Sequence, residues 1–365
     1  MNTEQPLFAV PPFRTLFGLI PVYSFLIVCG AALAIFLACR EERRAGLPKD
    51  TIIDLCFWLI PFGIIGARIY YVIFAWDAFR DNPVSILYIW EGGIAIYGAV
   101  IAGLIVILVF CRRRRLSVRA VCDVIAPGLV LAQAIGRWGN YFNQEAYGEA
   151  IVQPALQFFP FGVLIDEGGV SVWHMATFFY ESLWNVLVFI LLMIGRRKWF
   201  RKPGDVFGCY AFCYSAGRLL IEDFRMDSLY AAPSLRASQL LALLICAAIW
   251  FLVARRAWAD SQAGMMNLQP GTNSPAGTNS RAGGTQQVPS VRRISRPVIL
   301  ILAIVHYLYA VVILLYCFSL PVFGNLTLAG RALLLGGYSL SALITCAVLY
   351  GKSDPSEVCY AIHSH

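Results

Sequence analysis

The sequence has few charged residues for its length. Only 14% of its 365 residues are Asp, Glu, Lys or Arg, whereas soluble domains carry about a quarter. Hydrophobic residues make up 59% of the chain, and the mean hydropathy is +0.68. This shortage of charge excludes a soluble globular protein and predicts an integral membrane protein.

The chain also lacks a cysteine pattern that would indicate a metal or disulfide site. Its eleven cysteines show neither metal-ligand spacing nor a paired arrangement outside the apolar runs. Most of them lie inside those runs, where a free cysteine behaves as a small hydrophobic residue. Cys209 and Cys213 stand four residues apart on one helical face, and we expect them to be packing residues. The sequence therefore predicts no bound metal.

Long apolar runs predict nine transmembrane helices. A run of about 20 residues crosses a hydrocarbon core of roughly 30 Å. Backbone groups in lipid must pair internally, so these spans are helices, and the longest are too long for barrel strands. The predicted spans lie near residues 20–39, 53–75, 93–111, 120–137, 175–195, 205–224, 237–254, 298–318 and 332–350.

The basic residues predict the orientation of these spans. Sixteen Lys and Arg residues follow spans one, three, five and seven, and only four lie on the opposite side. The positive-inside rule then puts the N-terminus outside a bacterial cell membrane and the C-terminus in the cytoplasm. The net charge of +8 therefore reflects topology and contacts with anionic lipid, and we expect no nucleic-acid partner.

The chain divides into a large unit, a linker and an appendage. Residues 1–256 hold the first seven spans, and 138–173 within them, aromatic but free of Lys and Arg, predict a small extracytoplasmic cap. Residues 257–297 are rich in Gly, Ser, Thr, Pro and Gln and predict a disordered cytoplasmic linker. Residues 298–365 predict a two-helix transmembrane hairpin with a short tail.

Ionisable residues within the spans are the strongest functional signal, because they are costly in lipid. Two of them, Asp54 and Asp123, lie near the starts of their spans and are interpreted as helix caps. Arg218 and Glu222 stand four apart and are expected to pair. The spans contain Asp54, Arg68, Asp123, Arg137, Glu181, Arg218 and Glu222.

Topology places several charged residues near the outer membrane surface. Arg137 and Glu145 lie at the outer end of span four, Glu181 starts span five, and Arg218 lies toward the outer end of span six. An arginine fork grips phosphate at two points, which fits an enzyme acting on a lipid headgroup. A transporter with a charged pathway is the alternative, but no internal repeat or filter-like motif supports it.

The stretch GRWGNYFNQEAYG at residues 136–148 resembles the signature of the bacterial prolipoprotein diacylglyceryl transferases. This signature is long and mixed in character, and the resemblance covers roughly residues 18–256. Other segments agree in order and spacing: Val22-Tyr23, GARIYYVIF at 66–74, IWEGGIAIYGAVIAG at 89–103, 123–127, TFFYES at 177–182 and YSAGRLLIEDFR at 214–225.

The resemblance implies an all-α polytopic membrane protein with a seven-helix transferase core. It also implies an activity: transfer of the diacylglyceryl group of phosphatidylglycerol to the lipobox cysteine of a prolipoprotein signal peptide, with release of glycerol phosphate. No cofactor is implied. By residue match, Arg137 and Arg218 correspond to the family's essential arginines. Further expected substrate-binding residues are Asn140, Asn143, Glu145, Glu181, Glu222, Tyr23 and Arg68.

Some positions depart from the family pattern and leave alternatives open. Tyr97 stands where some members have a histidine, and Glu149 where an arginine is common. Tyr97 is then a candidate catalytic base, although an unperturbed tyrosine, with a pKa of about 10, is a weak one. These departures and the extra hairpin leave two other hypotheses: a headgroup-binding relative with a changed acceptor, and a membrane transporter.

Overall fold

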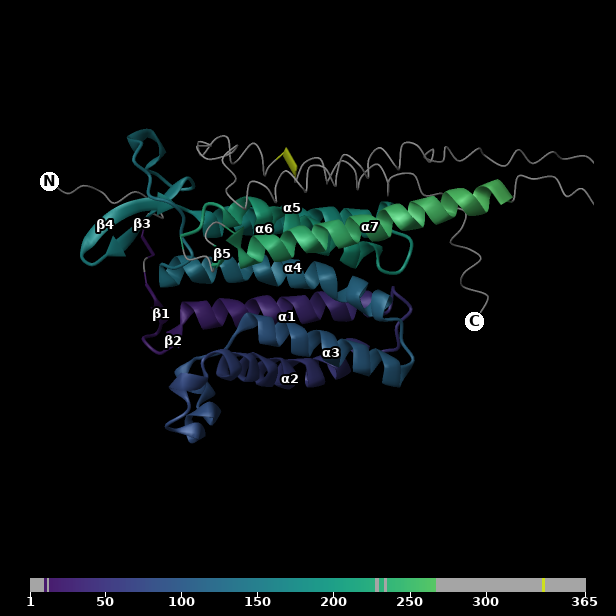
Figure 1. Ribbon diagram of the computed structural model, residues 1–365, viewed down its shortest axis with the longest axis horizontal. Helices are drawn as coiled ribbons and strands as arrows, with labels where there is room; N and C mark the ends of the chain where they lie inside the picture. Colours follow the sequence, from purple (N-terminus) through teal and green to yellow (C-terminus); the bar gives the residue numbers. More distant parts are fainter. Residues whose placement is uncertain (1–9, 12, 227–229, 233–234, 267–336, 339–365) are drawn as a thin grey trace, which may run out of the picture.

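The computed structural model describes residues 10–11, 13–226, 230–232, 235–266 and 337–338. Seven long helices run through this part of the chain, at the positions predicted for the first seven spans (Figure 1). They are α1 (Val22–Glu42), α2 (Thr51–Phe74), α3 (Ile96–Arg114), α4 (Val118–Asn143), α5 (Thr177–Lys198), α6 (Asp205–Glu222) and α7 (Ala237–Met266). The prediction of a mostly helical, multi-pass membrane protein is confirmed.

The helices lie side by side with α4 near the middle (Figure 1). Helix α4 packs against α1 on one side and against α5 and α6 on the other. Helices α2 and α3 form a pair beyond α1, and α7 covers α6. Six of the seven described helices are long and apolar enough to cross a membrane, and α6 is the exception.

Helix α6 falls outside that group because its 18 residues include Asp205, Arg218 and Glu222. It is nevertheless the centre of the largest hydrophobic cluster, where Phe212 and Ala216 are fully buried. Helices α4, α5 and α7 surround it. A helix enclosed by protein in this way can carry charged side chains in a bilayer, provided that they find partners inside the bundle.

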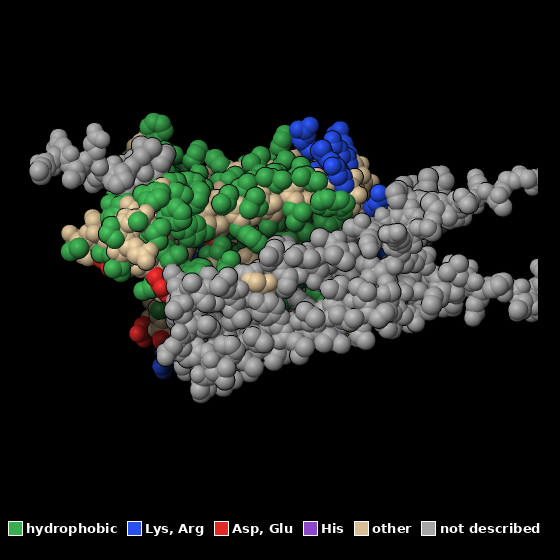
Figure 2. Space-filling view, turned by 90° about the horizontal axis from the view of Figure 1, so that it is seen from above, with side chains coloured by type: hydrophobic (Ala, Val, Ile, Leu, Met, Phe, Trp, Pro, Cys, Tyr) green, Lys and Arg blue, Asp and Glu red, His purple; other side chains and the backbone are tan. Residues whose placement is uncertain are grey.

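The two ends of the bundle differ in character. One end, here the cap end, carries the antiparallel hairpin of β3 (Gly162–Glu167) and β4 (Val170–Met175). The opposite end, here the basic end, gathers Lys and Arg at the last turns of α3 and α5. Figure 2 shows hydrophobic side chains along the bundle between these ends, and the basic cluster at the end away from the cap.

Smaller elements complete the cap end. Two short hairpins precede α1 and α7, and single-turn 3-10 helices follow α2 and lie in the cap. The strands are β1 (Thr15–Leu16), β2 (Ile20–Pro21), β5 (Tyr230–Ala232) and β6 (Leu235–Arg236). The 3-10 helices are η1 (Trp76–Ala78), η2 (Pro83–Leu87), η3 (Ile89–Glu91) and η4 (Pro154–Leu156).

Two helices continue past the predicted domain boundaries. The cap was expected to begin at residue 138, but α4 continues to Asn143. The linker was expected to begin at residue 257, but α7 runs to Met266. In both places the helix extends past the end of the apolar run, and composition does not reveal such an extension. The rest of the predicted linker and, apart from residues 337–338, the predicted hairpin lie outside the described residues.

The two aspartates interpreted as caps of their own helices have other partners. Asp54 forms an ion pair with Arg114 at 2.7 Å. Asp123 accepts hydrogen bonds from the backbone N–H groups of Gly204 and Phe207, at 2.6 and 2.8 Å. Asp123 therefore caps the start of α6 from the neighbouring helix α4. This carboxylate satisfies orphan donors at the positive end of the α6 dipole, and it fixes α6 against α4.

Candidate functional site

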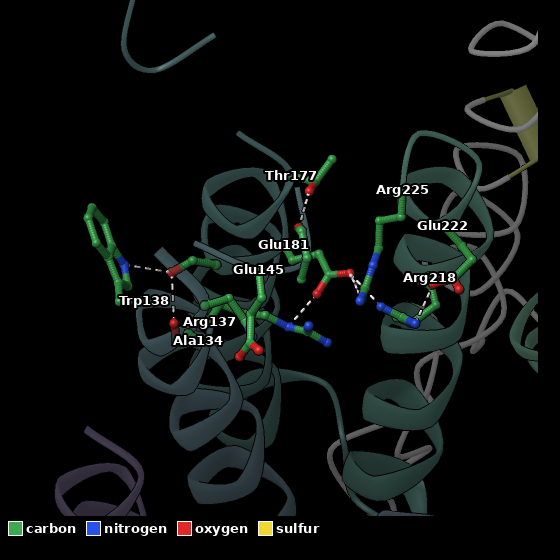
Figure 3. Close-up of polar contacts among 12 residues, drawn as sticks. Ala134, Arg137, Trp138, Glu145, Thr177, Glu181, Arg218, Glu222 and Arg225 are labelled. Atoms are coloured by element: carbon green, nitrogen blue, oxygen red, sulfur yellow. Dashed lines mark hydrogen bonds and ion pairs between the residues drawn. The ribbon is translucent and has the colours of Figure 1, made fainter. Parts of the chain in front are cut away.

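A buried carboxylate, Glu181 on α5, links arginines from three parts of the chain. Its side chain is 4% exposed. Oε2 pairs with Nε of Arg137 at the end of α4, and Oε1 lies 2.5 Å from Nη1 of Arg218 on α6. Oε1 also lies 3.6 Å from Nη1 of Arg225, just after α6. Figure 3 shows Arg137 reaching Glu181 from one side and Arg218 and Arg225 from the other.

Arg218 has a second acidic partner on its own helix. Its Nη2 pairs with Oε2 of Glu222, four residues later, as the sequence predicted. The two terminal nitrogens of the guanidinium thus pair with two different carboxylates, which fixes the plane of the group (Figure 3). Pairs with this spacing lie on one face of a helix, so Glu222 holds Arg218 toward α5.

Arg137 is held differently, because only its Nε is engaged. Among the described residues, its two terminal amino groups form no hydrogen bond or ion pair. The side chain keeps 20% of its surface exposed. A guanidinium presents its donors in a planar fork that matches two oxygens of a phosphate. Arg137 is therefore oriented by Glu181 while its fork stays available to a ligand.

The cluster is rich in arginine. Its described ion pairs join the guanidinium groups of Arg137, Arg218 and Arg225 to the carboxylates of Glu181 and Glu222. The fork of Arg137 that Glu181 leaves available suits an anionic ligand with two oxygens. A phosphodiester is such a ligand.

A strained turn after α4 brings further polar groups to the same place. Gln144 and Ala146 adopt left-handed backbone angles, with φ of 53° and 56°, a conformation that costs about 1–2 kcal/mol in residues with a side chain. Between them Glu145 folds back, and its Oε1 accepts hydrogen bonds from Asn140 at 2.9 Å and Asn143 at 3.3 Å. Such strain clusters at functional sites, and here it gathers three predicted residues.

The turn is locked to the strand-like segment that carries Arg225. Glu149 donates its backbone N–H to the carbonyl of Phe224, and Met226 donates to that of Tyr147. Gly148 lies between these two hydrogen bonds. A Cβ on Gly148 would come within 2.9 Å of Met175, Thr177 and the Phe224 carbonyl. Only glycine permits this close approach, which sets the position of Arg225 relative to the turn.

Side chains on neighbouring helices position the end of α4. Trp138 donates to Ser182 of α5 at 3.2 Å, and Ser182 donates to the Ala134 carbonyl at 2.9 Å (Figure 3). From α1, the ring of Tyr23 packs against Gly139, where a Cβ would lie 2.5 Å from the ring. The predicted residue Tyr23 therefore lies beside the site, where its ring packs against α4 next to Asn140.

Comparison with known proteins adds the family. The family model described as prolipoprotein diacylglyceryl transferase matches residues 13–255. A relative from Enterococcus faecalis, named phosphatidylglycerol–prolipoprotein diacylglyceryl transferase, is 47% identical over 247 residues, which is 66% of this chain and 88% of the relative. Relatives of the same name from Shouchella clausii and Limosilactobacillus reuteri are each 44% identical, over 65% and 64% of this chain and 86% of each relative.

The chain belongs to the prolipoprotein diacylglyceryl transferase family. The matched residues include all five members of the ion-paired cluster and the strained turn after α4. The family match ends at residue 255, within α7. The resemblance found from the sequence is confirmed.

Two residues predicted for the site, Arg68 and Tyr97, have no described contact with the arginine cluster. Arg68 on α2 donates to the carbonyls of Ser85, Ile86, Gly92 and Gly93 at 2.7–2.8 Å, and stacks over Phe79. Tyr97 on α3 is exposed and packs near Tyr70. Helix α1 lies between the pair α2 and α3 on one side and α5 and α6 on the other (Figure 1). Within the described residues, neither side chain contacts the arginine cluster.

We expect Arg68→Met to destabilise the protein without a specific loss of phospholipid affinity. The four carbonyls held by Arg68 belong to the loop between α2 and α3. Hydrogen bonds to a charged group contribute about 1.5–3 kcal/mol each, and their losses overlap, so we expect a decrease of about 2–4 kcal/mol in unfolding free energy. Thermal unfolding in detergent measures it. A normal midpoint with a raised KM for phospholipid would instead support Arg68 as a substrate ligand.

Sequence reasoning missed one buried polar residue beside the arginine cluster. Asn185 on α5 follows Glu181 by one helical turn and is 2% exposed. With Glu181, Trp184, Tyr214, Gly217, Arg218 and Ile221 it lines a narrow pocket between α5 and α6. An asparagine carries no charge, so the search for ionisable residues in spans passed over it. Its spacing of four from Glu181 was the available signal.

Proposed function

We propose that this protein transfers the diacylglyceryl group of phosphatidylglycerol to the lipobox cysteine of prolipoproteins. One observation supports this most: the fork of Arg137 has no described partner, and Arg137 shares the carboxylate of Glu181 with Arg218. Phosphatidylglycerol has a phosphodiester of charge minus one and a diacylglyceryl group on the far side of it. The names of the relatives, which specify this lipid and this protein substrate, support the same reaction.

In this proposal Arg137 and Arg218 bind the phosphate between α4 and α6. The substrate cysteine reacts as its thiolate, which the nearby arginines stabilise, and its proton is released to water. The thiolate sulfur attacks the glyceryl carbon bonded to the phosphate oxygen. A C–S bond forms as that C–O bond breaks, and glycerol phosphate leaves with the electron pair. The two arginines stabilise the charge that builds on the leaving group.

The other site residues have supporting roles in the proposal. Glu181 and Glu222 orient the guanidinium groups. Asn140, Asn143 and Glu145, which are hydrogen-bonded together, face the headgroup glycerol or the peptide. Arg225 adds charge from the segment paired with the turn. Tyr97 stays a prediction from the family comparison, since no described contact joins it to the cluster.

We further propose that the cap end faces the outside of the bacterial cytoplasmic membrane. Lys and Arg concentrate at the other end, where α3 and α5 finish, and such residues favour the cytoplasmic side. The N-terminus is then outside and the end of α7 inside. The arginine cluster is at the level of the outer-leaflet headgroups, within reach of a prolipoprotein that has crossed the membrane.

One experiment tests both proposals. A membrane-impermeant peptide with a lipobox cysteine is added to right-side-out and to inverted vesicles that contain the protein and phosphatidylglycerol, and mass spectrometry follows the peptide. We expect a diacylglyceryl mass gain and equimolar glycerol phosphate with right-side-out vesicles alone. A peptide with serine in place of the cysteine is the control and stays unmodified.

The other outcomes of this experiment are equally informative. A gain only with inverted vesicles would contradict the orientation but support the transfer. A mass gain that retains phosphate would mean phosphatidyl transfer, and the absence of any gain would contradict the transferase reaction. Transport of the lipid without peptide modification would favour the transporter alternative.

A further inference from the structure

The pocket beside Arg218 contains a polar group that has no role in the proposed binding of phosphate. This group is the side chain of Asn185, which is only 2% exposed. Within the described residues no hydrogen bond to its side-chain amide is found. A polar side chain beside a pocket that has no described protein partner can be satisfied by a ligand. The side chain lines the pocket that Arg218 and Glu181 share, so a ligand in this pocket can supply the missing partner.

The depth of Asn185 identifies the part of the lipid that it meets. Helix α5 starts at the cap end, and Asn185 lies one turn further along it than Glu181, about 6 Å at 1.5 Å per residue. On the antiparallel α6, Tyr214 lies one turn deeper than Arg218. In a phospholipid whose phosphate is at Arg218, the glyceryl carbons and their ester groups come next toward the membrane interior.

The rest of the pocket is suited to that part of the molecule. Trp184 and Ile221 are apolar walls, and Trp184 is fixed by a hydrogen bond from its indole N–H to the Cys213 carbonyl at 2.9 Å. Arg218 is engaged by two carboxylates. Asn185 is thus an uncharged donor in the inner part of the pocket, which it shares with Tyr214 of α6, and an ester carbonyl is the acceptor that a diacylglyceryl group offers there.

We infer that the side-chain amide of Asn185 donates a hydrogen bond to an ester carbonyl of the diacylglyceryl group, and so selects diacyl lipids over their ether analogues. The inference rests on the proposed phosphate site at Arg137 and Arg218. Ether lipids keep the phosphate and the reacting carbon but lack the carbonyls. A site built to hydrogen-bond a substrate rejects an analogue without the partner, because the buried group is left unpaired.

The test compares diacyl phosphatidylglycerol with its dialkyl ether analogue as donors in the peptide lipidation assay. For the wild type we expect kcat/KM to be about tenfold higher with the ester lipid, the effect of one buried hydrogen bond. In Asn185→Leu the ratio of the two values falls close to one, mainly through loss of activity on the ester lipid. Asn185→Ser, which keeps a donor, retains part of the preference.

The ratio of kcat/KM with the ester lipid to kcat/KM with the ether lipid is measured in one preparation of each protein. It therefore does not depend on the fraction of a variant that is folded. Gln133→Leu is the matched control, because it removes a half-buried amide that is hydrogen-bonded to Tyr210, and it keeps the full preference. An ester preference that survives in Asn185→Leu, or is absent from the wild type, would overturn the inference. Failure of the phosphate site is recognised separately, by full activity of Arg218→Ala on both lipids.

Discussion

Arg137→Ala and Arg218→Ala are each expected to reduce kcat/KM for diacylglyceryl transfer by about 10²–10³, the usual loss when one donor to a developing negative charge is removed. Both guanidinium groups meet at Glu181 (Figure 3). Purified variants in vesicles with phosphatidylglycerol and a lipobox peptide give the rates. The two losses are expected to be less than additive in the double variant, because the arginines act on one phosphate.

The matched control for this prediction is Arg196→Ala. Arg196 is also a largely buried arginine on one of the same helices, and it pairs with Glu41 at 2.7 Å. It lies in the last turn of α5, at the basic end. Its removal takes away the same charge and a similar ion pair, far from the cluster, and we expect a rate within about threefold of wild type per folded molecule. Equal losses in Arg196→Ala and Arg218→Ala would mean that the effect is structural.

Glu181→Gln is expected to lower kcat by about 10² while KM for phosphatidylglycerol changes little. The substitution leaves Arg137, Arg218 and Arg225 without their shared carboxylate. Their extra positive charge still attracts the phosphate, so ground-state binding persists. The fixed geometry is lost, and a displacement of about 1 Å can reduce a rate by about 10². Steady-state kinetics that separate kcat from KM measure this split.

Stability gives a second measurement on the same variant. Removing one partner of a buried ion pair typically costs about 3–5 kcal/mol, because the remaining charge is uncompensated. We therefore expect Glu181→Gln to unfold at a lower temperature than the wild type. Added phosphatidylglycerol is expected to raise the unfolding midpoint of the variant more than that of the wild type. Glu41→Gln is the control, since Glu41 also pairs with two arginines, Arg44 and Arg196. A normal kcat in Glu181→Gln would show that Glu181 does not position the arginines.

Much of the fold could be predicted from the sequence, because apolar runs and basic flanks report directly on the membrane. The seven described helices match the seven predicted spans to within a few residues at most ends. The ends that differ most, after 137 and after 254, are places where a helix continues into polar sequence. Hydropathy measures the lipid environment and does not record where backbone hydrogen bonding stops.

The site was predicted in part for a similar reason. Span order placed Arg137, Glu181 and Arg218 at one depth, and they do meet. Depth alone does not give the angular position around the bundle, and Arg68, also predicted for the site, hydrogen-bonds to the loop between α2 and α3. The convergence of three arginines on Glu181 requires the packing of α4, α5 and α6, which no local pattern in one helix records.

The most direct test of the phosphate site is a lipid-binding measurement on the double variant Arg137→Ala/Arg218→Ala. Native mass spectrometry of the detergent-purified protein can compare retention of phosphatidylglycerol with that of diacylglycerol, which has the same acyl chains and no phosphate. We predict that the wild type and Arg196→Ala prefer phosphatidylglycerol, and that the double variant binds the two lipids equally. An unchanged preference in the double variant would contradict the account.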